Sequence, residues 1–271
     1  MNYLKNKVKI MGVLNANEDS FYASSRFNAN NAIAKIEQMI ADGADIIDIG
    51  GVSSRPGSVG VRCEEELERI KPIVESIYEH RLFEKVDFSL DTYSPLCAQF
   101  GLDRGFTIIN DITALNNDAL AKIIKSYDAS VVLMHMQGKP SYMQSNPHYE
   151  NILTELDAFF DERIAKAKRF GIEKIILDVG IGFGKTLEHN LALLKYQAHF
   201  LHFGYELLVG ASRKSMIDAI IPTPIEQRLA GTLAIHLVAV KEGASIVRVH
   251  DVKEHVQALS VQEAIGRVSL S

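Results

Sequence analysis

The chain has few cysteines and no excess of positive charge, and each absence excludes a class of protein. Its two cysteines, Cys63 and Cys97, do not form a CxxC pair. So few thiols in 271 residues indicate a reducing compartment, where we expect both to be small buried side chains. A formal net charge of −5 argues against a nucleic-acid-binding protein, which needs a basic surface to neutralise phosphates.

Long apolar runs are also missing. The longest, such as Ser130–Met134, are far shorter than a membrane span, so we expect no membrane partner. The first residues lack the apolar core of a secretory signal peptide, and no low-complexity tract or Pro/Gly/Ser-rich linker divides the sequence. We therefore expect a cytoplasmic globular protein with one domain over residues 1–271.

Short apolar runs alternate with longer segments of helical period along the chain. The expected strands are Val8–Leu14, Asp45–Ile49, Val86–Leu90, Thr107–Ile109, Ser130–Met134, Lys174–Leu177, Glu206–Val209 and Ser245–Val249. The expected helices are Asn30–Ala41, Glu64–Tyr78, Pro95–Gly101, Asp118–Ser126, Tyr149–Arg169, His189–Phe200, Pro224–Glu242 and Val252–Gly266. The side chains of Asn30 and Asn31 are expected to cap the first helix, and Gly43 to end it.

Strand–helix alternation requires parallel strands, and strands buried on both faces are apolar throughout, so this pattern is typical of an α/β protein. About eight such units in a chain of this length predict a (β/α)8 TIM barrel that forms a single domain. An open, doubly wound sheet uses the same units, and periodicity alone does not separate the two arrangements.

Most of the expected strands are followed at once by polar or charged residues. These residues are Asn15, Asp48, Asp91, Asn110 with Asp111, His135, Asp178, Ser212 with Arg213 and Lys214, and Arg248 with His250. A single such residue often only caps the next helix or forms a turn. A regular series predicts a site, because the carboxyl ends of barrel strands converge on one mouth. Acceptors among them suit a heterocycle with N–H donors, and cations suit an anion.

Several segments together resemble the dihydropteroate synthase family, in order from the first strand to the last. They are Met11–Phe21, Asp48–Gly57, Ser89–Tyr93, Ile109–Ile112, Met134–Met136, Asp178–Lys185, Gly210–Ser215 and Arg248–Asp251. The resemblance implies that the amine of p-aminobenzoate displaces pyrophosphate from 7,8-dihydropterin-6-ylmethyl diphosphate, with Mg²⁺ assisting. It also implies a homodimer, for which Leu229–Val240 offers a candidate surface, although a core-facing helix would look the same.

The resemblance also implies roles for individual residues. Those that match the family's pterin-binding positions are Asp91, Asn110, Asp178 and Lys214, with Met134 as a wall of the pocket. Those that match the diphosphate site are Asn15, Arg248 and His250, and with Lys214 they are the candidate catalytic residues. Asn15 is also the candidate Mg²⁺ ligand. Those that match the p-aminobenzoate region are Ser54, Arg55, Pro56, Phe183 and Ser212.

Two loops depart from the family pattern. Asn17 and Glu18 stand where the first loop usually carries Thr-Pro, and residues 23–25 replace an Asp-Gly-Gly stretch. Val52 stands where the second loop usually carries Glu, and Ser54 keeps the hydroxyl of the usual Thr. Altered rates or inhibitor response are therefore expected to arise in these loops, whereas the pterin pocket keeps its residues.

Two further motifs have weaker functional interpretations. Gly184-Lys185-Thr186 looks like the end of a phosphate-binding P-loop, but Val179 stands where that motif needs glycine. His199 and His202 lie three apart in a helical stretch, and no third metal ligand follows at the usual spacing. We therefore expect ordinary surface or partly buried histidines there.

Two other functions compete with the synthase. A methyltetrahydrofolate-binding methyltransferase domain shares the pterin-binding barrel, but has no need of the cations in Ser212–Lys214 and Arg248–Asp251 as anion grips. A non-catalytic pterin-binding paralogue is supported only by the altered first loop.

Overall fold

The computed structural model describes residues 7–16, 25–53, 57–58 and 60–268, with only the backbone described over 25–29. The strands are β1 Lys9–Asn15, β2 Ile46–Gly50, β3 Asp87–Asp91, β4 Ile108–Asp111, β5 Ser130–Met134, β6 Ile175–Asp178, β7 Glu206–Val209 and β8 Ile246–Val249. The α-helices are α1 Ser25–Ala41, α2 Cys63–Glu79, α3 Pro95–Leu102, α4 Asp118–Ser126, α5 Ile152–Arg169, α6 Leu187–Lys195, α7 Ser215–Ile220, α8 Leu229–Lys241 and α9 Val252–Gly266. Short 3-10 helices are η2 Leu82–Glu84, η3 Gln197–Phe203 and η4 Ile225–Gln227.

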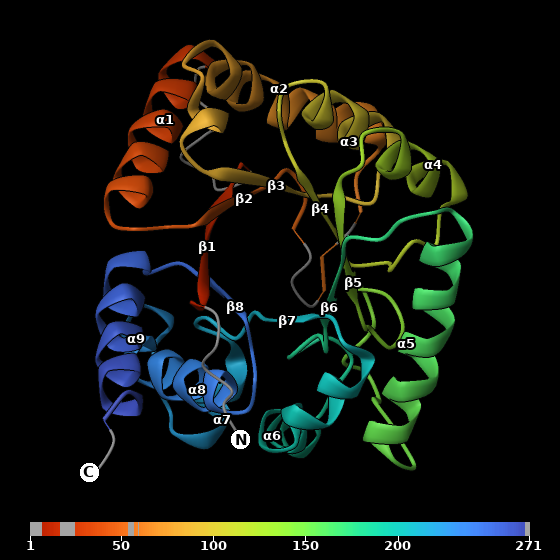
Figure 1. The fold of residues 1–271 in the computed structure, drawn as a ribbon, viewed down its shortest axis with the longest axis vertical. Helices are drawn as coiled ribbons and strands as arrows, with labels where there is room; N and C mark the ends of the chain where they lie inside the picture. The colour runs from red at the N-terminus through yellow and green to blue at the C-terminus, as the bar shows by residue number, and fades with distance from the viewer. Residues whose placement is uncertain (1–6, 17–24, 54–56, 59, 269–271) are drawn as a thin grey trace.

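The strands form a closed barrel in which each pairs in parallel with its neighbours along the chain, and β8 pairs with β1. Helices surround the barrel, with α1 and α9 on either side of the point where it closes (Figure 1). The expected (β/α)8 TIM barrel is therefore confirmed, and the open sheet is excluded because its terminal strands would not pair. None of the helices in the described ranges is long and apolar enough to cross a membrane.

Two apolar layers hold the barrel together. The larger lies between strands and helices and includes fully buried Phe88, Phe160 and Phe200. The smaller fills the barrel interior and consists of Met11, Ile46, Ile108, Val132, Ile176, Leu208 and Ile246. Because side chains alternate along a strand, residues two positions beyond these also face the interior, nearer the carboxyl-terminal mouth.

Three helical segments differ from the sequence prediction. Helix α1 begins at Ser25, before the expected caps at Asn30 and Asn31. The segment expected as one helix from His189 begins at Leu187 behind a Thr186–His189 capping box, ends at Lys195, and continues as η3. The segment expected from Pro224 is divided into η4 and α8, and α7 was not expected at all. Short helices carry too few turns for a periodic pattern to mark them.

Candidate active site

A layer of polar side chains closes the interior at the carboxyl ends of the even-numbered strands. Its members are Asp48, Asn110, Asp178 and Arg248, each two residues beyond an isoleucine of the interior apolar cluster. Strand alternation therefore aims all four into the barrel, in the same way that layers of four side chains fill other TIM barrels. Sequence-distant polar residues thus meet at one mouth.

Arg248 joins three strands within this layer. Its Nε donates to Asp48 Oδ2 at 2.6 Å, and a terminal nitrogen donates to Asp91 Oδ2 at 2.9 Å. The Asn110 amide also donates to Asp48 Oδ2, at 3.2 Å. Burial alone would lower the pKa of Arg248, but the Asp48 and Asp91 carboxylates beside it raise that pKa overall. The guanidinium therefore stays charged and holds both carboxylates in place.

Asp91, the second carboxylate bonded to Arg248, lies in an environment that favours its protonated form. Burial raises its pKa to about 7, Arg248 opposes that rise, and the nearby Asp48 carboxylate adds to it. A group with such a pKa titrates near neutrality, which is common in binding and catalytic sites.

Asp178 and Lys214 lie side by side at the same mouth. Asp178 Oδ1 accepts a hydrogen bond from the Gly180 backbone N–H at 2.7 Å, and burial raises the pKa of this carboxyl. Burial lowers the pKa of Lys214 to about 8, against the attraction of Asp178. The Lys214 ammonium donates to the Ile181 carbonyl and lies 4.4 Å from the centre of the Phe183 ring. This pair offers a planar ligand an acceptor and a donor next to an aromatic face.

The loop from β6 to α6 is packed tightly against the end of β5. A Cβ on Gly180 would lie 2.0 Å from the His135 carbonyl oxygen, and one on Gly184 would lie 2.3 Å from that of Gln137. Both glycines have positive φ, so no other residue fits either position without strain. Glycine is therefore required at both positions because the loop backbone packs directly against the chain at and after the end of β5.

Buried Lys185 holds the β6–α6 loop against His135, the residue after β5. Its Nζ lies 3.0 Å from His135 Nδ1 and donates to the carbonyls of His135, at 3.2 Å, and Phe183, at 3.0 Å. Burial lowers the pKa of Lys185 far below its usual value and lowers that of His135 to about 2. A neutral imidazole Nδ1 accepts from the lysine, which explains why Gly184-Lys185-Thr186 is a packing element here and not a P-loop.

Ser212 and His250 form a second polar group at the mouth. His250 Nδ1 lies 2.9 Å from Ser212 Oγ, and the His250 backbone N–H donates to the same oxygen at 3.3 Å. Arg213, between them and the outside, donates through Nε to Asp251 at 3.0 Å. The structure therefore brings together Ser212 and His250, and it directs Arg213 into an ion pair.

Asn15 ends β1 beside Gly50 of β2. A Cβ at Gly50 would lie 3.6 Å from Asn15 Oδ1 and 3.7 Å from Asp91 Oδ2, so glycine leaves both oxygens room at the mouth. Amide and carboxylate oxygens are hard ligands of the kind that Mg²⁺ prefers, so the residues present fit this ion. Met134, at the end of β5, is buried and pairs in register with Asp178.

Some predicted residues cannot be placed, and others were missed. Ser54, Arg55, Pro56, Asn17 and Glu18 lie outside the described residues. Sequence reasoning noted Asp48 and His135 but gave neither a role. Asp48 could have been found from its position after Ile46-Ile47, which matches those of the other members of the layer. Lys185 was considered only as part of a P-loop, because its partner His135 lies 50 positions away.

Comparisons with known proteins agree with this geometry. The family model described as a pterin binding enzyme matches residues 11–250. Dihydropteroate synthase of Escherichia coli K12 is 44% identical over 258 residues, covering 94% of this chain and 90% of that protein. The bifunctional dihydropteroate synthase/dihydropteroate reductase of Helicobacter pylori is 42% identical over 260 residues, which cover 96% of this chain and 68% of that protein. The crystal structure of the Yersinia pestis dihydropteroate synthase with a sulfonamide drug complex matches with a TM-score of 0.90 at 38% identity. The match covers 97% of this chain and 95% of that one.

Proposed function

Because the chain belongs to the dihydropteroate synthase family, we propose that the carboxyl-terminal mouth of the barrel binds a dihydropterin diphosphate and p-aminobenzoate and joins them. The amine nitrogen forms a bond to the pterin methylene carbon while the bond from that carbon to the diphosphate oxygen breaks. The bonding electrons leave with pyrophosphate, and the amine proton passes to solvent. The single observation that carries this assignment is the polar layer of buried Asp48, Asn110 and Asp178 with partly buried Arg248, beside which Lys214 lies.

The pterin ring is assigned to the part of the mouth around Asp178. One carboxylate oxygen of Asp178 is engaged by Gly180, and the other accepts from the amino and ring N–H groups of the pterin. Lys214 donates to the oxo group, Asn110 and Asp91 complete the polar edge, and Met134 packs on the ring. A ring without this edge would leave buried polar groups unpaired, so it would bind weakly.

The diphosphate is assigned to Asn15, Arg248 and His250. Arg248 already balances the charge of Asp48 and Asp91, so its remaining donor capacity faces the leaving group. His250, held by its contact with Ser212 Oγ, adds a donor to the phosphate oxygens. When bound, Mg²⁺ supplies positive charge that stabilises the departing pyrophosphate, and Asn15 would hold it together with substrate oxygens.

The p-aminobenzoate is assigned to the side of the mouth formed by Phe183 and Ser212. The Phe183 ring carries the Lys214 ammonium at 4.4 Å on one side and offers an aromatic surface for the benzoate ring. Ser54, Arg55 and Pro56 are proposed to complete this subsite. An aryl amine is nucleophilic while neutral, so positioning it against the methylene replaces a general base.

The direct test mixes the protein with the pterin diphosphate, p-aminobenzoate and Mg²⁺, and follows pyrophosphate and pteroate. Formation of both in equal amounts supports the synthase. Pterin binding without pyrophosphate release would favour the non-catalytic paralogue, and cobalamin-dependent methyl transfer without pteroate would favour the methyltransferase.

Asp178→Asn tests the pterin assignment. Asparagine keeps the oxygen that accepts from Gly180 but replaces the other acceptor by an amide donor. We expect pterin affinity to fall by about 2–3 kcal/mol, the cost of a lost hydrogen bond to a charged group. Calorimetric titration with a diphosphate-free pterin measures this change, and unchanged affinity would move the pocket away from Asp178.

We further assign the active form to a cytoplasmic homodimer with one domain over residues 1–271. Both cysteines are free thiols, which suits a reducing compartment; Cys97 is buried as expected, whereas the expectation was wrong for Cys63, which is exposed at the start of α2. Helix α8 buries Thr232, His236 and Ala239 but exposes Val238. Ile220 of α7 and Val261 of α9, on helices drawn next to α8 in Figure 1, are exposed apolar side chains as well. Light scattering of the protein in solution tests the dimer, and a monomer at all concentrations would refute it.

A further inference from the structure

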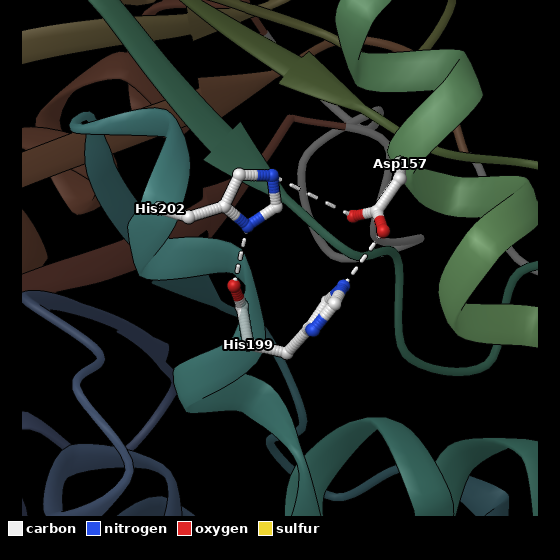
Figure 2. Close-up of side chains that lie close together, drawn as sticks. All are labelled: Asp157, His199 and His202. Atoms are coloured by element: carbon white, nitrogen blue, oxygen red, sulfur yellow. Dashed lines mark hydrogen bonds and ion pairs between the residues drawn. The ribbon is translucent and has the colours of Figure 1, made fainter.

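Asp157, His199 and His202 meet between α5 and η3, in the helical layer that surrounds the barrel strands. Asp157 belongs to α5, and both histidines belong to η3 (Figure 2). One potential ligand atom from each residue lies within 4.8 Å of the others. His199 Nε2 is 2.7 Å from Asp157 Oδ2, and His202 Nε2 is 4.0 Å from Asp157 Oδ1. Asp157 therefore supplies the third group that the spacing of the two histidines alone did not reveal.

The tautomer of His202 follows from its backbone contact. Its Nδ1 lies 2.6 Å from the His199 carbonyl oxygen, which can only accept a hydrogen bond. Nδ1 therefore carries hydrogen, and in the neutral ring the lone pair is on Nε2, which faces Asp157 (Figure 2). Metal-binding histidines are commonly held in this way, with the second ring nitrogen bonded to a backbone carbonyl.

Asp157 Oδ1 is the unsatisfied atom of the cluster. It is buried and makes no hydrogen bond within the described part of the chain. A carboxylate oxygen and an imidazole lone pair face each other at 4.0 Å with no hydrogen between them while His202 is neutral. Such an arrangement is unfavourable by itself, and a cation between the two atoms relieves it.

The spacing also suits a metal ion. Zinc bonds to imidazole nitrogen and carboxylate oxygen are about 2.0–2.2 Å long, which places tetrahedral ligand atoms about 3.3 Å apart. The two observed separations, 2.7 and 4.0 Å, lie on either side of that value. These separations are to the two different oxygens of the Asp157 carboxylate, and one ligand atom from each residue lies within 4.8 Å of the others, so the side chains need only close in around an ion.

The packing beneath the cluster keeps the two elements in place. Phe200 and Phe203 of η3 contact Phe160 of α5 edge to face, with ring centres 5.7 and 5.8 Å apart. His199 packs against Phe200, and His202 against Phe203. The aromatic contacts therefore preset the distance from the histidines to Asp157, and little ordering is required when a ligand binds.

We propose that Asp157, His199 and His202 bind a first-row divalent transition metal, with Zn²⁺ the best match, and that the ion fastens η3 to α5. Imidazole nitrogens favour such metals over Mg²⁺, which prefers oxygen ligands. On binding, neutral His199 moves its hydrogen from Nε2 to Nδ1, so that Nε2 becomes a ligand. The side chains of His199 and His202 are 38% and 51% exposed, so the ion enters from solvent and water completes its coordination.

The test is calorimetric titration of the metal-free protein with Zn²⁺ alone. Wild type is expected to bind one equivalent more than the double variant His199→Ala/His202→Ala, at micromolar zinc or below. The same zinc concentration should raise the Tm of wild type and leave that of the double variant unchanged, since only a ligand of the folded state stabilises it. Pteroate formation should be equal in both proteins, because the cluster lies outside the active site.

His80→Ala is the matched control. His80 is exposed and, like His202, has Nδ1 held by a backbone carbonyl, that of Ser76 at 2.8 Å, but it belongs to no metal-ligating group of the described residues. The His80→Ala variant should bind zinc with the stoichiometry and affinity of wild type. Asp157→Asn keeps the shape of the cluster and should weaken zinc binding by at least about tenfold. Equal zinc stoichiometry and affinity in wild type and the double variant, or saturation only at millimolar zinc, would overturn the site.

Discussion

Asp48 accepts hydrogen bonds from two side chains that lie far from it along the sequence. Its Oδ2 receives both Arg248 Nε and Asn110 Nδ2, while its Oδ1 is buried without a hydrogen-bond partner among the residues described. Asp48 is fully buried, so we expect it to act through Arg248, the residue that the proposed function assigns to the diphosphate. Its role is therefore to position the guanidinium.

Asp48→Asn should reduce both stability and catalysis. The amide keeps one acceptor but lacks the charge that balances Arg248, and Asp91 remains as the second partner. We expect the free energy of unfolding to fall by about 1–3 kcal/mol, with a lower kcat. Urea denaturation and steady-state rates measure both effects. Asp128→Asn, which breaks the exposed pair with Lys174, serves as the control and should leave the free energy of unfolding nearly unchanged.

The pH dependence of the rate follows from Asp91 and Lys214. Asp91 has a pKa raised to about 7 chiefly by burial, so below that pH it gains a proton and loses its acceptor. Lys214 has a pKa lowered to about 8 chiefly by burial, so above that pH it loses a donor proton. We therefore expect kcat/KM to form a bell with a maximum between these values.

The Lys214→Arg variant shows whether the alkaline limb of the pH profile arises from the enzyme or from a substrate. Guanidinium stays charged throughout the range, so the variant should be slower but should lose the alkaline limb near pH 8. A limb that persists in the variant would assign that titration to the substrate or to another residue.

At the scale of elements, the β6–α6 loop shows how backbone shape supports the site. Asp178, Gly180, Phe183 and Lys185 all lie within it or at its start, and its glycines touch the chain after β5. A change in this loop therefore moves the pterin acceptor and the aromatic surface together.

Gly180→Ala should displace the β6–α6 loop from the end of β5. The new Cβ would lie 2.0 Å from the His135 carbonyl, and the loop would have to move away from β5. Gly204→Ala is the matched control, because Gly204 also has positive φ but has nothing within 4 Å of its Cβ position. We expect about 1–2 kcal/mol of destabilisation for the control, from backbone strain alone. Gly180→Ala should cost clearly more and weaken pterin binding. Equal losses in the two variants, measured by urea denaturation, would contradict the steric argument.

The elements differ in how far the sequence predicts them. The strands are predicted to within two residues at either end, because each is a short, mainly apolar run with a polar residue at or near its end. The helices after Ser212 and after Lys195 were missed or merged, because α7 has six residues and η3 lacks α-helical periodicity. Tertiary packing, as of Phe200 against Phe160, determines such segments, and local pattern does not contain it.

At the scale of the whole molecule, the barrel interior combines a binding surface with a sealed core. The apolar cluster around Ile246 lies below the polar layer and carries no charge. Binding residues are thus concentrated at one end of the strands, while the middle supplies stability.

Ile246→Ala tests this division. Ile246 is fully buried two residues before Arg248, so its truncation leaves a cavity in the interior cluster. We expect the free energy of unfolding to fall by about 2–5 kcal/mol. Leu191→Ala, at an exposed position of α6, should change it by at most about 0.5 kcal/mol. Thermal or urea denaturation measures both changes in the free energy of unfolding. Similar changes in the two variants would show that the barrel interior is not closely packed.

The site could be predicted as a set of residues but not as a set of contacts. Strand ends identified Asp91, Asn110, Asp178 and Arg248, because barrel topology converts their positions into one mouth. The pairing of Arg248 with Asp48 depends on side-chain direction across the barrel, and no local signal encodes it. For the same reason, the sequence does not show that Asp157 lies beside the two histidines of η3.

Asp48 and Arg248 are separated by 200 positions, yet they share a hydrogen bond in the innermost polar layer. In a chain that ends before β8, the ring would stay open and Asp48 would lack its guanidinium partner. We therefore expect such a truncated chain not to bind a pterin, because the proposed binding surface is complete only when β8 pairs with β7 and β1.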